Sequence, residues 1–229
     1  MFLGHFAVGL ASKRLAPTVS LGALFLACQL ADLVWPVFVL LGLERVEIAP
    51  GATAVTPMRF VSYPFSHSLA ALALWAVLLA SVYGLARRSR LATLGVIAAT
   101  VLSHWVLDAI SHAPDMPVTV GGRARVGLGL WNSVPATVVV EALLFAAGLA
   151  VYLGATRALD RTGSVALWAL AGFLALVYVA NLLGPPPPDA RTVAWAGNAM
   201  WLFMLWGFWI DRHRAARQPA PEPAQAVAA

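Results

Sequence analysis

The segment from Ser103 to His112 places residues that can bind a metal ion or move a proton on one face of an apolar helix. At about 100° per residue, His104, Asp108 and His112 lie at about 0°, 40° and 80° around the helix axis. Ionisable side chains are costly to bury in an apolar segment, so their shared stripe favours a functional role. A His–Asp hydrogen bond that only packs helices together would give the same pattern.

The composition is that of an integral membrane protein. Of the 229 residues, 61% are hydrophobic and 11% are charged, whereas soluble domains carry about 25% charged residues. In a soluble protein the net charge of +5 would fit nucleic-acid binding, but here Lys and Arg gather in short loops, as in membrane proteins. We therefore expect membrane lipids as partners and no nucleic acid. Cys28, the single cysteine, excludes a disulfide within the chain and a Cys-rich metal site.

The apolar runs predict an all-α fold, a polytopic transmembrane helical bundle with about six spanning helices. These cover about residues 19–43, 64–86, 91–111, 132–154, 164–184 and 192–210. Residues 2–12 are shorter than the roughly 20 residues of a span and predict a half-spanning or re-entrant helix. Pro36 is expected to kink the first span. The transmembrane domain then covers residues 1–211, and the basic, Pro/Ala-rich tail 212–229 is predicted to be disordered and cytoplasmic.

The distribution of Lys and Arg predicts the orientation. Ten lie on one side of the membrane: Lys13, Arg14, Arg87, Arg88, Arg90, Arg157, Arg161, Arg212, Arg214 and Arg217. Five lie on the other: Arg45, Arg59, Arg123, Arg125 and Arg191. The richer side should be cytoplasmic. Both ends of the chain are then cytoplasmic, the two longest loops, 44–63 and 112–131, face outward, and we expect the inner (cytoplasmic) membrane.

The ionisable residues inside the apolar segments share one depth. They are His5, Asp32, His67, His104, Asp108 and Glu141. With a rise of about 1.5 Å per residue, all six lie about 18–30 Å from the cytoplasmic ends of their helices, in a hydrocarbon core roughly 30 Å thick. Helices placed at random would scatter them over the whole depth. Their convergence predicts one joint site in the outer half of the bilayer.

The residue types at this site suit a divalent metal ion. Three histidines with carboxylates and no cysteine fit Zn²⁺ best, with Mn²⁺ and Fe²⁺ as alternatives. The predicted metal ligands are His5, Asp32, His67, His104 and Asp108. A catalytic zinc ion keeps three protein ligands and one open position. We therefore expect a remaining carboxylate, Asp32 or Glu141, to act as the catalytic general base.

Two of these residues have simpler interpretations. His67 fits an interfacial histidine at the start of a helix, with Ser66 as the N-cap. Glu141 fits a protonated side chain or a partner of Asn132 or Ser133, a few turns away.

Four short motifs resemble those of a known family. They are His-x-x-x-Gly from His5 to Gly9, an Asp after the next apolar helix at Asp32, His67-Ser68 at the start of a helix, and His-x-x-x-Asp from His104 to Asp108. This pattern is similar to the inner-membrane metal-dependent hydrolase family, typified by a LexA-regulated hydrolase, over roughly residues 1–130. The resemblance implies a polytopic α-helical membrane protein with hydrolase activity and a metal site. It also implies that these five histidines and aspartates are the ligand or catalytic set.

The chain departs from the family pattern at two places. Where the family shows Pro-Asp-x-Asp, residues 30–34 read Leu-Ala-Asp-Leu-Val, with Val34 in place of the second acid. Where the family shows His-Arg-Gly before Thr-His-Ser, residues 62–68 read Ser-Tyr-Pro-Phe-Ser-His-Ser. One carboxylate, one histidine and one arginine are missing, which counts against a two-metal site and against hydrolytic activity and leaves a site for a single metal ion open.

The sequence therefore predicts a membrane-embedded metal-dependent hydrolase whose substrate is a lipid or a lipid-linked ester or phosphodiester. Two other functions remain open. A transporter would pass protons or a metal ion along the intramembrane His and Asp side chains, although the sequence shows no inverted repeat. A non-catalytic membrane scaffold would use the same polar residues to fix helix register.

Overall fold

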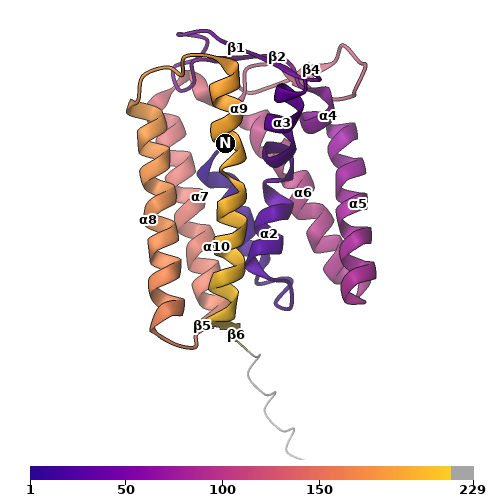
Figure 1. Ribbon diagram of the computed structural model, residues 1–229, viewed down its shortest axis with the longest axis vertical. Helices are drawn as coiled ribbons and strands as arrows, with labels where there is room; N and C mark the ends of the chain where they lie inside the picture. Colours follow the sequence, from indigo (N-terminus) through magenta and orange to yellow (C-terminus); the bar gives the residue numbers. More distant parts are fainter. Residues whose placement is uncertain (218–229) are drawn as a thin grey trace, which may run out of the picture.

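The apolar runs form helices throughout the part of the chain that the computed structural model describes, residues 1–217 (Figure 1). The helices are α1 (Leu3–Ser12), α2 (Leu21–Cys28), α3 (Leu30–Leu40), α4 (Pro64–His67), α5 (Leu69–Arg87), α6 (Leu91–Ser111), α7 (Val134–Ala155), α8 (Arg161–Leu183), α9 (Ala190–Asn198) and α10 (Trp201–Arg212). A 3-10 turn covers Leu130–Asn132. The predicted all-α bundle is confirmed.

Within residues 1–217, five segments are long and apolar enough to cross a membrane, as expected of an integral membrane protein. They are α5, α6, α7, α8 and the continuous stretch Ala190–Arg212, and α2 with α3 would make a sixth as a bent pair. The bend of 57° lies between Cys28 and Leu30. The break in this span therefore lies at Gln29, whereas α3 continues through Pro36, where the sequence predicted a kink. Proline still leaves the carbonyl four residues earlier, that of Asp32, without its helical donor.

In the described part of the chain, three short antiparallel strand pairs lie at the two ends of the bundle (Figure 1). At one end, which we call the hairpin end, β1 (Arg45–Ile48) pairs with β2 (Met58–Ser62), and β3 (Met116–Pro117) pairs with β4 (Arg125–Val126). At the opposite end, β5 (Thr156–Ala158) pairs with β6 (Arg214–Ala216). Both predicted outward loops thus meet at the hairpin end.

The strand β6 changes the predicted limit of the C-terminal tail. Arg212 ends α10, Arg214–Ala216 pair with β5, and the backbone N–H of Arg217 donates to the carbonyl of Ala155 at the end of α7. Arg214 is buried and donates hydrogen bonds to Thr156 Oγ1 and to the carbonyl of Gly163. The tail predicted from residue 212 therefore begins no earlier than residue 218. Residues 218–229 lie outside the described residues.

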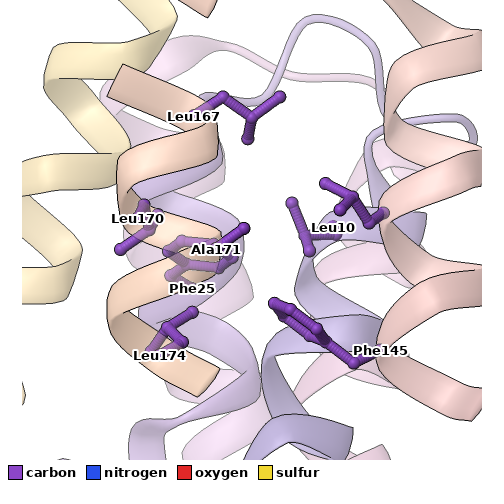
Figure 2. Close-up of a pocket in the computed structure, with 8 residues that line it drawn as sticks. Leu10, Phe25, Phe145, Leu167, Leu170, Ala171 and Leu174 are labelled. Carbon is purple, nitrogen blue, oxygen red and sulfur yellow. The ribbon is translucent and has the colours of Figure 1, made fainter. Parts of the chain in front are cut away.

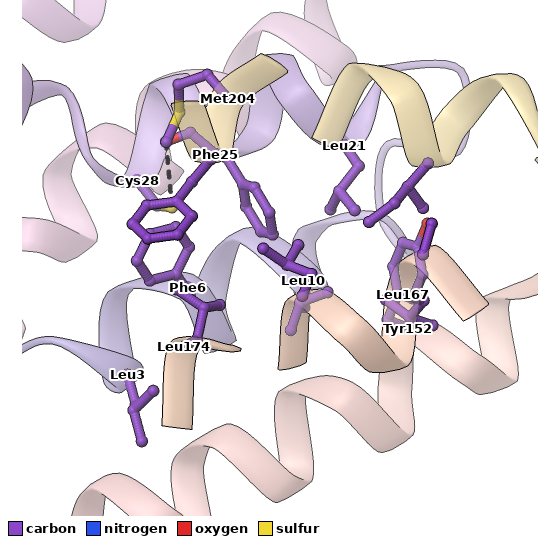
Figure 3. Close-up of a cluster of buried hydrophobic side chains, with 14 of the residues drawn as sticks. Leu3, Phe6, Leu10, Leu21, Phe25, Cys28, Tyr152, Leu167, Leu174 and Met204 are labelled. Atoms are coloured by element: carbon purple, nitrogen blue, oxygen red, sulfur yellow. Dashed lines mark hydrogen bonds between the residues drawn. The ribbon is translucent and has the colours of Figure 1, made fainter. Parts of the chain in front are cut away.

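The two short N-terminal helices lie inside the bundle rather than at its surface. Phe6 of α1 and Phe25 of α2 are fully buried and pack edge to face, with ring centroids 5.1 Å apart (Figure 3). Leu10 of α1 belongs to the same apolar cluster, which also includes residues of α7, α8 and α10. Because protein surrounds α1, its ten residues do not have to span the hydrocarbon.

Close packing of α1 is possible because α7 carries a glycine at the contact. A Cβ at Gly148 would lie only 2.4 Å from the carbonyl oxygen of Ala7. A small apolar cavity of about 10 Å³ remains between α1, α2, α7 and α8, between Leu10, Phe145 and Leu170 (Figure 2). It has no polar lining atom, so it cannot hold an ordered water.

Candidate metal centre

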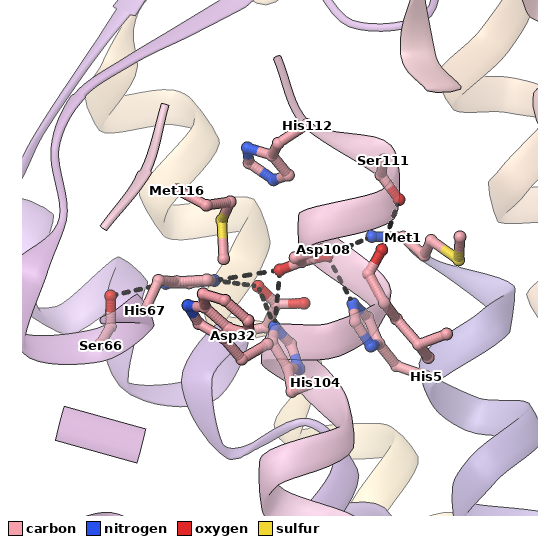
Figure 4. Close-up of polar contacts among 12 residues, drawn as sticks. Met1, His5, Asp32, Ser66, His67, His104, Asp108, Ser111, His112 and Met116 are labelled. Atoms are coloured by element: carbon pink, nitrogen blue, oxygen red, sulfur yellow. Dashed lines mark hydrogen bonds and ion pairs between the residues drawn. The ribbon is translucent and has the colours of Figure 1, made fainter. Parts of the chain in front are cut away.

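Five of the six predicted site residues meet near the hairpin end of the bundle. His5 comes from α1, Asp32 from α3, His67 from α4, and His104 and Asp108 from consecutive turns of α6 (Figure 4). Four of them are almost completely buried, and only the Asp32 side chain remains 27% exposed. We call these five residues the His/Asp cluster.

The imidazole nitrogens of the cluster face its two carboxylates at short range. His104 Nε2 lies 3.1 Å from Asp108 Oδ2 and 3.7 Å from Asp32 Oδ1. His67 Nε2 lies 3.3 Å from Asp32 Oδ1 and 3.8 Å from Asp108 Oδ2. Bonds of about 2.0–2.2 Å around a tetrahedral zinc ion would separate neighbouring ligand atoms by about 3.3 Å. The spacing therefore fits donors around one ion.

The bend between α2 and α3 fixes the tautomer of His104. Its Nδ1 lies 2.8 Å from the carbonyl oxygen of Cys28, at the last residue of α2. A carbonyl can only accept, so Nδ1 carries the proton and donates. In the neutral ring Nε2 is then the lone-pair nitrogen, and it is the atom that faces both carboxylates.

A second relay fixes the tautomer of His67 in the same way. Its Nδ1 lies 2.7 Å from Ser66 Oγ, and the Ser66 hydroxyl donates to Glu44 Oε2 at 2.6 Å. Because the hydroxyl proton goes to the carboxylate, Ser66 Oγ accepts from His67 Nδ1. Metal-binding histidines usually donate their other ring N–H to such a partner.

Glu44 and Ser66 are parts of the site that the sequence analysis did not identify. Glu44 is buried and also accepts from the backbone N–H groups of Phe65 and Ser66 at 2.8 and 2.9 Å, at the start of α4. The expectation that Ser66 caps the next helix is wrong, because Ser68 accepts from Ala71 and is the N-cap of α5. Some 20 residues separate Glu44 from its partners, so no local pattern could have revealed the contact.

His5 contacts two other members of the cluster, Asp108 and His104. Its Nε2 donates to Asp108 Oδ1 at 3.0 Å, and its ring stacks on His104 with centroids 3.8 Å apart and an interplanar angle of 3°. The amino group of Met1 lies 2.5 Å from the same Asp108 oxygen. The two oxygens of Asp108 therefore have different roles, since Oδ1 faces donors and Oδ2 faces the rings of His67 and His104.

Glu141, the sixth predicted residue, lies apart from the cluster. Its carboxylate accepts from the backbone N–H groups of Phe2, at 3.1 Å, and Gly4, at 3.0 Å, at the start of α1. These N–H groups have no partner within the helix, and the positive end of the helix dipole stabilises the carboxylate. Glu141 thus fixes the helix that carries His5, and its partners are not Asn132 or Ser133.

A polar network covers the cluster at the hairpin end. His112, which caps the C-terminal end of α6, lies 3.0 Å from Asp115 Oδ1 through Nδ1, and the Tyr63 hydroxyl donates to the same oxygen at 2.7 Å. Burial and the neighbouring Asp115 carboxylate raise the pKa of Tyr63, so its hydroxyl stays protonated. The network connects the residue before α4 to the loop after α6.

The donor set could hold a metal ion, and the ring planes indicate which residues can share it. Two overlapping groups have donor atoms within 4.8 Å of one another: His5, His104 and Asp108, and Asp32, His67 and His104. An imidazole nitrogen binds a metal in the plane of its ring, and the parallel planes of His5 and His104 never meet. The planes of His67 and His104 are inclined by 67° and do converge. The ring planes therefore favour His67 and His104, rather than His5 and His104, as the two histidines that could share one ion.

No family model, curated protein or solved structure matches this chain.

Proposed function

We propose that this chain is a membrane-embedded metal-dependent hydrolase whose substrate is a lipid or a lipid-linked ester or phosphodiester. One observation supports it above all others. The hydrogen bonds to Cys28 and to Ser66 turn two imidazole lone pairs toward two carboxylates in a buried site. Four acceptors that face one another repel unless a cation lies between them.

We assign His67 Nε2, His104 Nε2 and Asp108 Oδ2 as the protein ligands of one ion. His104 has one free ring nitrogen, so it binds one ion only. Zinc fits best because nitrogen and carboxylate donors in a tetrahedral arrangement are its usual environment. Within the part of the chain that the structure describes, His104 Nε2 is a buried nitrogen without a hydrogen-bond partner, as a ligand atom would be.

We assign different catalytic roles to the residues of the cluster according to their solvent exposure. A bound divalent ion would supply Lewis acidity that polarises an ester or phosphoryl oxygen. Asp32 is the accessible carboxylate, so we assign it as the general base that takes a proton from the attacking water. His5 holds Asp108 through Oδ1 and leaves Oδ2 for the ion. Burial of the other members excludes bulk water and strengthens their electrostatic interactions.

We further propose that the protein lies in the inner membrane with the hairpin end outward. The excess of Lys and Arg at the opposite end favours this orientation. The His/Asp cluster then lies in the outer half of the bilayer, where a lipid can approach sideways, and the end of α10 lies on the cytoplasmic side. The cytoplasmic N-terminus expected from the sequence does not fit this arrangement, because the amino group of Met1 contacts Asp108 inside the cluster.

Elemental analysis of the purified protein tests the metal. We expect about one zinc ion per chain in the wild type, loss of the metal in His104→Ala, and full metal content in the control Glu141→Gln, which alters a buried carboxylate outside the cluster. A wild type that contains no metal and gains none on incubation with Zn²⁺, Mn²⁺ or Fe²⁺ would refute the proposal. In that case protons on the rings of His67 and His104, rather than a metal ion, would relieve the repulsion between the acceptors. This is what a scaffold or a proton pathway would require.

Hydrolysis is tested separately with a panel of fluorogenic lipid esters and phosphodiesters in detergent. We expect turnover that Asp32→Asn abolishes while the metal content remains, because the ligands stay in place. Zinc uptake into vesicles without turnover would indicate the transporter instead.

A further inference from the structure

An apolar groove opens on the outer surface of the bundle next to the His/Asp cluster. Its volume is about 380 Å³, within the range of about 300–1,000 Å³ that is usual for ligand pockets. The lining comes from α3, α4, α5 and the two loops at the hairpin end, and it includes Phe38, Leu43, Phe65, Leu74, Trp75 and Val120. All eight lining residues are hydrophobic, and the one side-chain N–H among them, Trp75 Nε1, already donates to Phe65, so the groove fits an apolar ligand.

The groove includes an exposed face of a helix that could cross a membrane. Leu74 is 70% exposed in the bundle and lies on α5, one of the helices that could cross a membrane. Phe38 and Phe65 stand edge to face with centroids 6.4 Å apart and form an aromatic wall. The indole Nε1 of Trp75 donates to the carbonyl of Phe65 at 2.9 Å and holds this wall against α5.

The same short helix borders the groove and the cluster. Phe65 and His67 both belong to α4, and the backbone N–H of Phe65 is fixed by Glu44, which also holds Ser66. On the other side, Ala71 in the groove precedes Leu72, which packs with Ala31 in one buried cluster. Ala31 is adjacent to Asp32, the exposed member of the His/Asp cluster.

Positive charge lies where the groove meets the hairpin end. Leu43 leads into β1, where Arg45 is 69% exposed. Arg45 and Arg59 share one acidic partner, Glu47, at 3.3 and 4.0 Å, so this hairpin keeps an excess positive charge. An apolar groove at hydrocarbon depth below an exposed guanidinium matches a phospholipid, whose acyl chain lies below its phosphate.

We propose that this groove binds one acyl chain of a phospholipid and places the lipid phosphate at Arg45. Its role as a substrate subsite rests on the proposed function, but binding of the lipid does not. The wall of Phe38 and Phe65, with Phe65 hydrogen-bonded to Trp75, distinguishes this groove from ordinary lipid-facing surface.

Photo-crosslinking in nanodiscs tests the proposal. The full chain is reconstituted in phosphatidylcholine with a small fraction of phosphatidylcholine that carries a diazirine on its acyl chain, and adducts are mapped by peptide mass spectrometry. We expect adducts concentrated at Phe65 and the first two turns of α5. Leu74→Trp should remove this enrichment by filling the groove, whereas Leu85→Trp, at an 85% exposed site on the same helix outside the groove, should retain it.

Two outcomes would overturn the lipid site: equal labelling of all lipid-facing helices, or unchanged labelling in Leu74→Trp. Metal content, measured on the same samples, separates this result from the proposed function. Enriched labelling in a protein without metal would retain the lipid site and refute the hydrolase. Even labelling in a metal-containing protein would refute the lipid site and retain the hydrolase. Substitution of the exposed Leu74 leaves the core unchanged, so thermal unfolding of both variants should match the wild type.

Discussion

Hydrogen bonds to groups outside the His/Asp cluster decide which ring nitrogen of His67 and of His104 carries the proton and which one faces the carboxylates. Without the Cys28 carbonyl, His104 could place its proton on either nitrogen, and without Ser66 the same holds for His67. Partners of this kind orient a ligand ring and raise its basicity. The chemistry of the cluster therefore depends on residues that never touch the proposed ion.

Substitution of Ser66 tests this dependence. In Ser66→Ala, His67 Nδ1 loses its acceptor and Glu44 loses its hydroxyl donor, so we expect zinc affinity to fall by about 10–100-fold. A titration against a fluorescent zinc chelator measures the change. Ser103→Ala is the matched control, because Ser103 Oγ donates only to the carbonyl of Thr100. Equal affinity in Ser66→Ala and the wild type would contradict the proposed tautomer of His67.

His5 provides a second test at the residue scale. Because it holds Asp108 Oδ1 and its ring lies parallel to that of His104, we expect His5→Ala to weaken zinc binding by about 10–100-fold yet keep one ion per chain at saturation. His5→Gln supplies an N–H donor and should recover part of the affinity. If His5→Ala lost its metal as completely as His104→Ala, His5 would be a ligand and the assignment would be wrong.

At the scale of elements, the site depends on two short helices that pack against the longer ones. α1 carries His5 and α3 carries Asp32, and neither is long enough to span a membrane alone. The two helices are held by contacts to their neighbours, which include Glu141 at the start of α1 and Gly148 beside it. Disturbing these contacts should change stability before it changes the cluster.

Glu141→Ala leaves the N–H groups of Phe2 and Gly4 without a partner in a buried environment. We expect it to lower the free energy of unfolding by about 1–3 kcal/mol, measured by denaturant unfolding in detergent micelles. Glu141→Gln keeps one acceptor and should lose less. Metal content should stay at the wild-type level in the folded fraction of both variants. Loss of the ion would instead indicate that Glu141 belongs to the metal site.

The contact of α1 with α7 can be tested with two glycines of one helix. In Gly148→Ala the new methyl group meets the backbone of Ala7, so we expect a loss of about 1–3 kcal/mol. Gly154→Ala has open space around its Cβ and should be neutral or slightly stabilising, because alanine favours helix. The midpoints of thermal unfolding give the comparison, and equal midpoints would show that α1 can move away from α7.

At the scale of the whole molecule, the distribution of charge should decide the orientation. The hairpin end carries the arginines of the long loops, and the opposite end carries the larger basic group. Lys13 at that end donates to the carbonyl of Val19 and to Asp211, which ties the loop after α1 to α10. Because these contacts join the helices into one bundle, the bundle takes a single orientation in the membrane as a unit.

Cysteine labelling in intact cells tests this orientation. Native Cys28 is fully buried, so background labelling should be low. We expect Ala52→Cys in the β1–β2 loop to react with a membrane-impermeant maleimide from outside, and Ser89→Cys between α5 and α6 to react only after the membrane is permeabilised. The opposite pattern would place the hairpin end in the cytoplasm.

The sequence by itself determined the bundle and much of the cluster. The apolar runs predicted the helices closely, Leu91–Ser111 to the residue, because hydrophobic length is a local property of the chain. Depth counted along each helix also brought His5, Asp32, His67, His104 and Asp108 to one level, because the rise of a helix is constant.

Only the tertiary structure decided which residues at that level meet. Glu141 has a similar depth but faces the start of α1, because the face of α7 that carries Glu141 and Gly148 packs against α1. The relay from His67 to Glu44, the bend between α2 and α3 and the stacking of His5 on His104 join residues that are far apart in the chain. Such contacts depend on how helices pack, and periodicity within one helix carries no information about its neighbours.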